Sequence, residues 1–129
     1  MNKYMSEKRF LHGGDYNPDQ WLNYPEILEK DIELMQKANT NTFSIGMFSW
    51  ATLEPEEGQF NFEWLDKIMD DIAGIGGNVI LSTPSGARPA WMSHKYPEVL
   101  RTNERREKML HGGRHNHCFS SPVYREKIA

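Results

Sequence analysis

Residues 78–91 of the chain read NVILSTPSGARPAW, and this stretch decides the fold class. It opens with Val79-Ile80-Leu81, a short apolar run bounded by polar, glycine and proline residues, which is typical of a strand buried on both faces. Such a strand needs helices over it, so the pattern predicts an α/β layer architecture. Loops beyond the carboxyl ends of parallel strands hold ligands, and we therefore expect the loop with Arg88 and Trp91 to form one wall of a pocket.

Two similar strand-and-loop units precede this stretch. We expect one strand over residues 10–13 and another over residues 42–47, and each is followed by a long loop rich in polar and aromatic residues. Strand starts therefore recur every roughly 30–40 residues, a spacing that fits βα units and a parallel sheet.

Amphipathic helices are predicted between these strands. The first begins at Pro25, a residue suited to the first turn of a helix, and the second has Asn61 as its expected N-cap and ends at Gly76-Gly77. Each carries apolar residues at helical spacing on one face. These residues are Leu28, Ile32 and Met35 in the first helix and Leu65, Ile68 and Ile72 in the second.

The end of the chain predicts an incomplete fold. We expect short helical turns over residues 96–109 and a helix that starts at Pro122, capped by Ser121, and stops without a C-terminal signal. A closed (β/α)8 barrel takes about 250 residues. We therefore interpret residues 1–9 as a polar leader and residues 10–129 as the N-terminal portion of a (β/α)8 TIM barrel, truncated at its C-terminal end; a small open sheet is the alternative.

Composition narrows the function classes. The chain has 129 residues, 26% of them charged, and a net charge of −3, so it carries neither a basic stripe for nucleic acid nor a polybasic membrane signal. The first ten residues contain no hydrophobic segment of a secretory signal. The single cysteine, Cys118, excludes an internal disulfide and suits a reducing compartment, and we expect a cytoplasmic protein.

The predicted loops combine flat aromatic rings with acidic, amide and arginine side chains, a mixture that suits a sugar. Stacking on the rings would bind its CH faces, and the polar groups would bind its hydroxyls. Packing between helices is the alternative role of the tryptophans. Asp15 and Glu54 could be nominated as a catalytic pair, because glycoside hydrolysis needs two carboxyls about 5–5.5 Å apart in retaining enzymes. Acidic loop residues are, however, more often solvated turn residues.

Three histidines stand near the cysteine, at positions 111, 115 and 117. They lack the paired spacing of a zinc finger, and one cysteine does not complete a thiolate site. We favour Cys118 as one zinc ligand of a site finished by later residues over an autonomous zinc site. A small buried hydrophobe is its alternative role.

Five motifs together closely resemble the amino-terminal part of glycoside hydrolase family 42 β-galactosidases. They are HGGDYNPDQW at 12–21, FSWATLEPEEGQFNFEWLD at 48–66, TPSGARPAWM at 83–92, YPEVL at 96–100 and HGGRHNHCFSSPVYR at 111–125. The resemblance implies a (β/α)8 barrel followed by two further domains, and retaining hydrolysis of terminal β-galactosides or galacto-oligosaccharides. It also implies a homo-oligomer, commonly a trimer.

The resemblance also implies roles for single residues. Arg114, four residues before the motif cysteine, would bind the galactosyl unit, and Cys118 would be one of four zinc ligands. Both catalytic glutamates of the family lie beyond residue 129, so we expect no catalytic residue and no activity in this chain alone. The residues expected to bind substrate are Tyr16, Trp21, Trp50, Glu54 and Arg114. Alternatives are another barrel glycosidase, a non-catalytic carbohydrate-binding half-barrel and a purely structural fragment.

Overall fold

Three short parallel strands form the sheet in the computed structural model, which describes residues 9–113 and 115–129. Strands β1 (Gly13–Asp15), β2 (Thr42–Ile45) and β3 (Asn78–Leu81) lie in the order β1-β2-β3. Each pairs in parallel with its neighbour, so the carboxyl ends of all three strands point to the same side of the molecule. The predicted leader falls almost entirely on residues 1–8, outside the described residues.

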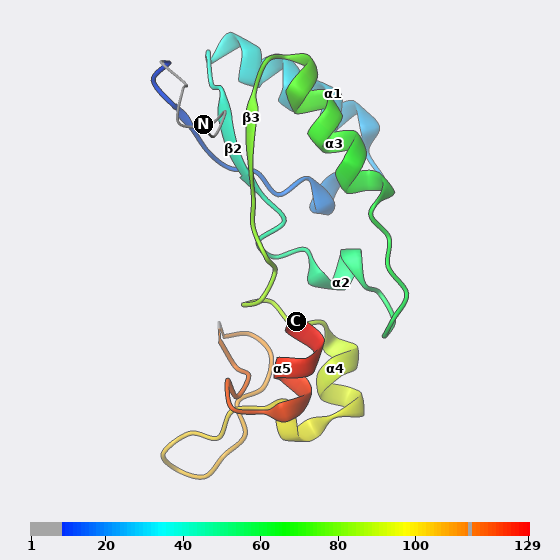
Figure 1. The fold of residues 1–129 in the computed structure, drawn as a ribbon, viewed down its shortest axis with the longest axis vertical. Coiled ribbons are helices and arrows are strands. Elements are labelled where there is room, and N and C mark those ends of the chain that lie inside the picture. The colour runs from blue at the N-terminus through cyan, green and yellow to red at the C-terminus, as the bar shows by residue number, and fades with distance from the viewer. Residues whose placement is uncertain (1–8, 114) are drawn as a thin grey trace.

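Two helices cover one face of this sheet (Figure 1). Helix α1 (Pro25–Lys37) follows β1, and helix α3 (Glu63–Gly74) follows β2. Their apolar faces enclose a core with the inward side chains of β2, as the helical spacing predicted. The buried members of this core are Met35, Phe43, Ile45, Leu53, Leu65, Ile68 and Ile72.

A second group of short helices lies beyond the carboxyl ends of the strands, in the lower part of Figure 1. It contains α2 (Trp50–Leu53), α4 (Ala90–Lys95) and α5 (Pro122–Ile128), and the turn η3 (Pro97–Val99) follows α4. A separate apolar cluster holds these helices together. Its buried members are Trp50, Met92, Val99 and Tyr124.

The first strand lies further along the chain than predicted, at Gly13–Asp15 instead of residues 10–13. The side chain of Asn41 explains this shift, because it accepts from the His12 amide and donates to the Phe10 carbonyl in place of ladder bonds. The ladder begins where the two backbones come close. A Cβ at position 13 would lie 1.7 Å from the Thr42 carbonyl oxygen, so only glycine fits there.

Strand β3 is not buried on both faces, contrary to the prediction from its apolar run. Ile80 and Leu81 are 55% and 57% exposed, because β3 is an edge strand and no described helix covers its other face. Two smaller predictions also differ. Phe62, not Asn61, is the N-cap of α3. Residues 96–109 contain one helical turn, η3, followed by isolated bridges that join Leu100 to His117 and Thr102 to Lys108.

The predicted fold class is confirmed: the chain is α/β and forms three βα units of the N-terminal part of a (β/α)8 barrel. The predicted cap of α5 is also confirmed, since the Tyr124 amide donates to the Ser121 hydroxyl over 3.3 Å. None of the helices in residues 9–113 and 115–129 has the length and hydrophobicity needed to cross a bilayer.

Candidate functional site

A cavity of about 450 Å³ opens beside the exit loop of β3. It lies on the side of the sheet where the strands have their carboxyl ends, and parallel α/β folds bind ligands on that side. One wall comes from that loop and includes Arg88. The opposite wall comes from the segment that begins at His111, more than twenty residues later. The lining residues are Phe48, Gly86, Ala87, Arg88, His111, Gly112, Gly113 and Asn116. The loop predicted to form one wall of a pocket therefore does line a cavity, together with this later segment.

Arg88 is the buried cation of this cavity, and its side chain is only 5% exposed. Its Nη1 lies 3.4 Å from Nε2 of His111, and its Nε and Nη2 have no hydrogen-bond partner among the described residues. Burial lowers the pKa of Arg88, but a guanidinium keeps its charge in proteins. Because a buried charge without a partner is costly, the position calls for an acceptor oxygen.

His111 stands at the rim of the same cavity and contacts two other segments. Besides its contact with Arg88, its Nε2 lies 2.9 Å from the hydroxyl oxygen of Ser93 in α4. The side-chain amide of Asn116 donates to the Leu110 carbonyl over 3.0 Å, and this hydrogen bond joins the two ends of the loop. The contribution of Ser93 carries no signal in the sequence, because the residue is an ordinary position of a helix.

His117 lies next to this cavity but does not line it. The ring is fully buried and stacks on Tyr124 with centroids 4.2 Å apart and planes 18° apart. Burial lowers the pKa of His117, and the positive charges of Arg88, His115 and Arg101 lower it further. The ring is therefore neutral and acts as a packing element of the second apolar cluster.

Trp50 and Glu54, both predicted to bind substrate, form a separate buried pair. The indole nitrogen of Trp50 donates to Oε2 of Glu54 over 2.8 Å, and the Gly58 amide donates to Oε1 over 2.7 Å. The Glu54 carbonyl also accepts from the indole of Trp91 over 2.9 Å. Trp50 and Glu54 border a smaller cavity of about 190 Å³, in which Phe60 and Phe62 supply apolar surface.

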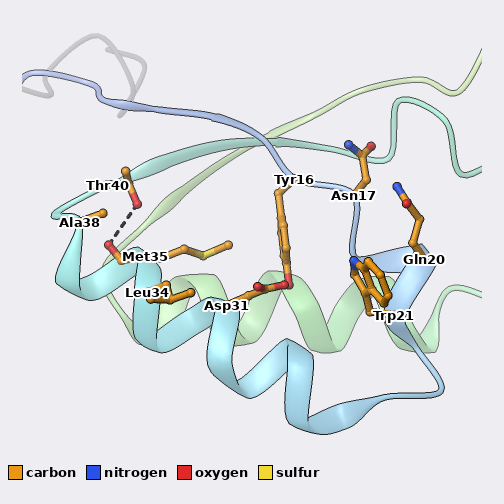
Figure 2. Close-up of a pocket in the computed structure, with 9 residues that line it drawn as sticks. All are labelled: Tyr16, Asn17, Gln20, Trp21, Asp31, Leu34, Met35, Ala38 and Thr40. Carbon is orange, nitrogen blue, oxygen red and sulfur yellow. Dashed lines mark hydrogen bonds between the residues drawn. The ribbon is translucent and has the colours of Figure 1, made fainter.

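Tyr16 and Trp21 border a third cavity, of about 440 Å³, between the exit of β1 and helix α1 (Figure 2). Trp21 closes the turn η2 (Pro18–Trp21), and the hydroxyl of Tyr16 points toward the carboxylate of Asp31. Burial first, and then the negative charge of Asp31, raise the pKa of Tyr16 well above its usual value. This tyrosine is therefore a neutral phenol that faces the helix layer.

The predicted substrate-binding residues thus do not all meet at one place. Tyr16 and Trp21 share one cavity, Trp50 and Glu54 share another, and Arg114 lies outside the described residues. Arg88 meets His111 and Asn116 at the cavity beside the exit loop of β3. Arg88 is predicted from the sequence to stand in a pocket wall, whereas His111 is weighed there only as a candidate metal ligand.

Cys118, the predicted metal ligand, is a partly exposed free thiol. Its backbone amide donates to the Val99 carbonyl over 2.7 Å, which fixes the position of the residue. In the described part of the chain, no three histidine, cysteine or acidic side chains are grouped closely enough to hold a metal ion. The residues present therefore offer one thiolate and do not make a zinc site by themselves.

Comparison with known proteins gives a consistent match. The family model of glycoside hydrolase family 42, described as beta-galactosidase, matches residues 15–129. The chain is 70% identical over 117 residues to beta-galactosidase GalA of Bacillus licheniformis, and this alignment covers 91% of the chain and 17% of that protein. It is 68% identical, with the same coverage, to beta-galactosidase GanA of Bacillus subtilis.

Solved structures agree with this match. The catalytic mutant E323A of Gan42B, a GH42 beta-galactosidase from G. stearothermophilus, is 67% identical and superposes with a TM-score of 0.92, covering 95% of this chain and 18% of that one. A beta-galactosidase from the haloarchaeon Halorubrum lacusprofundi is 34% identical with a TM-score of 0.84, covering 92% and 18%. The chain thus spans less than a fifth of the length of the relatives that it matches.

Proposed function

The chain belongs to glycoside hydrolase family 42, and on this premise we propose that the protein containing it is a β-galactosidase that hydrolyses terminal β-D-galactosides with retention of configuration. The observation that carries the proposal is the family match over residues 15–129, together with a polar cavity at the ligand-binding edge of the sheet. Arg114, at the position that the family resemblance gives to galactosyl binding, is proposed to bind the galactosyl unit.

The 129 residues alone are proposed to bind part of the sugar without cleaving it. A retaining mechanism needs two carboxyl groups about 5–5.5 Å apart at the glycosidic bond. No aspartate or glutamate lines the Arg88 cavity within the part of the chain that the structure describes. Glu54, which borders another cavity, accepts hydrogen bonds on both carboxylate oxygens, so it is held in place as a structural group. Both catalytic carboxyls are thus proposed to come from other residues of a longer polypeptide.

Hydrolysis of 4-nitrophenyl β-D-galactoside tests this proposal directly. We expect no release of nitrophenol by the purified 129-residue chain, and turnover by a polypeptide that carries it at the full length of its relatives. Activity that copurifies with the 129 residues would overturn the placement of the catalytic carboxyls. A full-length polypeptide that cleaves no β-galactoside would overturn the function.

Zinc binding is a separate proposal, in which Cys118 supplies one thiolate ligand. Its support is the family resemblance and the partial exposure of the thiol. Because the described residues offer no complete donor set, the other ligands would come from outside this chain. When bound, zinc would be structural: a site closed by four protein ligands has no open position for chemistry. Metal analysis of the full-length protein with Cys118→Ser tests it, and an unchanged zinc content would contradict it.

Two further proposals concern the whole protein and rest on the family resemblance and composition. We propose a homotrimer in solution, which light scattering of the full-length protein measures. We also propose a cytoplasmic location, since a single cysteine suits a reducing compartment. Detection of the native protein in fractionated cells measures this location, and a secreted protein would contradict it.

A further inference from the structure

Helices α1 and α3 lie side by side over the sheet (Figure 1), and a groove of about 440 Å³ opens between them. Residues of α1 form one wall, and residues of α3 with Ile75 just beyond it form the other. None of these residues lines the three cavities described above. The helices of a (β/α)8 barrel form its outer ring, so a groove between consecutive helices faces outward in the closed barrel as well.

The floor of this groove is apolar. Leu28 and Ile32, one turn apart on α1, and Ile75 are partly buried there and pack against the core between the helices and the sheet. Gly74 adds open space to the wall, because a Cβ at this position would meet no atom within 4 Å. An apolar side chain laid on the floor would remove the remaining surface of these residues from water, and this burial favours binding.

The rim of the groove is acidic. Lys67 donates to Asp71 over 2.6 Å, so these two charges offset each other. The carboxylates of Glu29 and Asp70 are exposed at the same rim and have no ion-pair partner among the described residues. The groove therefore presents two unpaired negative charges beside its apolar floor.

The two helices extend this negative charge beyond the rim. Helix α1, PEILEKDIELMQK, has four acidic residues and two lysines, and α3, EWLDKIMDDIAG, has four acidic residues and one lysine. In the rest of the 129 residues, lysine and arginine outnumber aspartate and glutamate. The acidic charge of the chain is thus concentrated on the helices that form the groove, where it attracts a basic surface and repels an acidic one.

We propose that the groove between α1 and α3 docks a basic amphipathic segment of a partner protein, whose apolar side chains lie on the floor and whose lysines or arginines pair with Glu29 and Asp70. Amphipathic helices bind apolar grooves in this way, with complementary charge at the rim. Two copies of this chain joined groove to groove would instead bring their acidic rims together, and like charges so placed oppose association. The complementary charge therefore comes from a different, basic surface.

Peptide binding to the full-length polypeptide tests the proposal. The probe is a fluorescein-labelled synthetic peptide of paired leucines and lysines, about twelve residues long and thus about 18 Å as a helix. We expect saturable binding by fluorescence anisotropy, weaker at about 1 M than at about 0.1 M salt. A peptide with serine in place of leucine keeps the charge but leaves the floor open to water, so it should bind at least about tenfold more weakly.

Charge reversal at the rim locates the binding site. Glu29→Lys combined with Asp70→Lys should weaken binding of the leucine–lysine peptide about three- to tenfold, the effect of two exposed ion pairs. Glu98→Lys combined with Glu104→Lys changes the net charge equally at exposed positions outside the groove and is the matched control, which should bind as the wild type does.

Three results would overturn the proposal: no binding to the wild-type protein, equally tight binding of the serine peptide, or an equal loss in both double variants. A change of oligomeric state in the groove variant alone, measured by light scattering, would also overturn it, because the groove would then be a contact between copies of the chain.

Discussion

The indole nitrogen of Trp50 donates a 2.8 Å hydrogen bond to the Glu54 carboxylate, one helical turn further along the chain. The second carboxylate oxygen accepts from the Gly58 amide, so Glu54 holds the loop after α2 in place. Both residues are predicted from the sequence to bind substrate. Their polar atoms are instead satisfied within the protein, at 5% and 4% exposure.

Replacement of Glu54 should destabilise the chain. Glu54→Leu would leave the buried indole of Trp50 without an acceptor, which costs about 1–3 kcal/mol of unfolding free energy, and would also remove the acceptor of the Gly58 amide. Glu54→Gln keeps one acceptor and should cost less. Urea denaturation followed by tryptophan fluorescence measures both, with the exposed Glu98→Gln as control. Unchanged stability in Glu54→Leu would mean that this pair does not hold the loop.

Acid should weaken the contacts of Glu57, which accepts from Lys127 and Tyr96 and pairs with Lys95. Lys127 first, and then Lys95, lower the pKa of Glu57 from 4.5 to about 2. Because the folded pKa is the lower one, the stabilisation is complete above about pH 4.5 and is lost as the pH falls toward about 2.

A variant isolates this contribution. Glu57→Gln should lower the melting temperature at neutral pH and flatten its decline between about pH 4.5 and about pH 2. Thermal melts of both proteins across this range give the difference curve, and Glu98→Gln again serves as control. A difference that stays constant throughout the range would show that the ion pairs of Glu57 do not stabilise the fold.

His117 should tolerate an aromatic replacement and reject a small one. His117→Phe keeps a ring against Tyr124 and removes two buried nitrogens that have no partner among the described residues, so stability should be equal or higher. His117→Ala leaves a cavity in the second apolar cluster and should cost about 2–4 kcal/mol. Chemical denaturation measures the unfolding free energy of both variants. A large loss of stability in His117→Phe would show that the ring nitrogens of His117 make contacts that the fold needs.

The open edge of β3 should make the 129-residue chain self-associate. Ile80 and Leu81 are more than half exposed on an edge strand, and such edges pair with other chains. Leu81→Lys should therefore reduce association measured by light scattering, because a lysine on the edge opposes pairing. Leu34→Lys, at an equally exposed position of α1, is the control and should change association less. An equal reduction of self-association in both variants would show that an added surface charge, and not the edge of β3, controls association.

The sequence predicted the positions of the helices more accurately than those of the strands. Spacing alone located the buried faces of α1 and α3, because an amphipathic helix repeats every turn and its pattern is local. The start of β1 depends instead on Asn41, which is distant in sequence and occupies the backbone groups of Phe10 and His12. The burial of β3 depends on elements beyond it, which an apolar run does not reveal.

The candidate site was only partly predictable for a related reason. The loop after β3 was predicted to form one wall of a pocket, and Arg88 of that loop does line a cavity. Which loop residues face a cavity and which pack inward depends on long-range contacts. Trp50 packs against Tyr124 of the last helix, and Ser93 meets His111 across eighteen residues. Residue type and spacing do not encode these pairings.

The anomeric configuration of the first product tests the central claim most directly. The full-length polypeptide would be mixed with 4-nitrophenyl β-D-galactoside and followed by proton NMR from the first minutes, before the released galactose mutarotates. A retaining β-galactosidase releases β-galactose first, with the α-anomer appearing only later, and this is the result that we predict. Initial release of α-galactose, or no galactose at all, would contradict it.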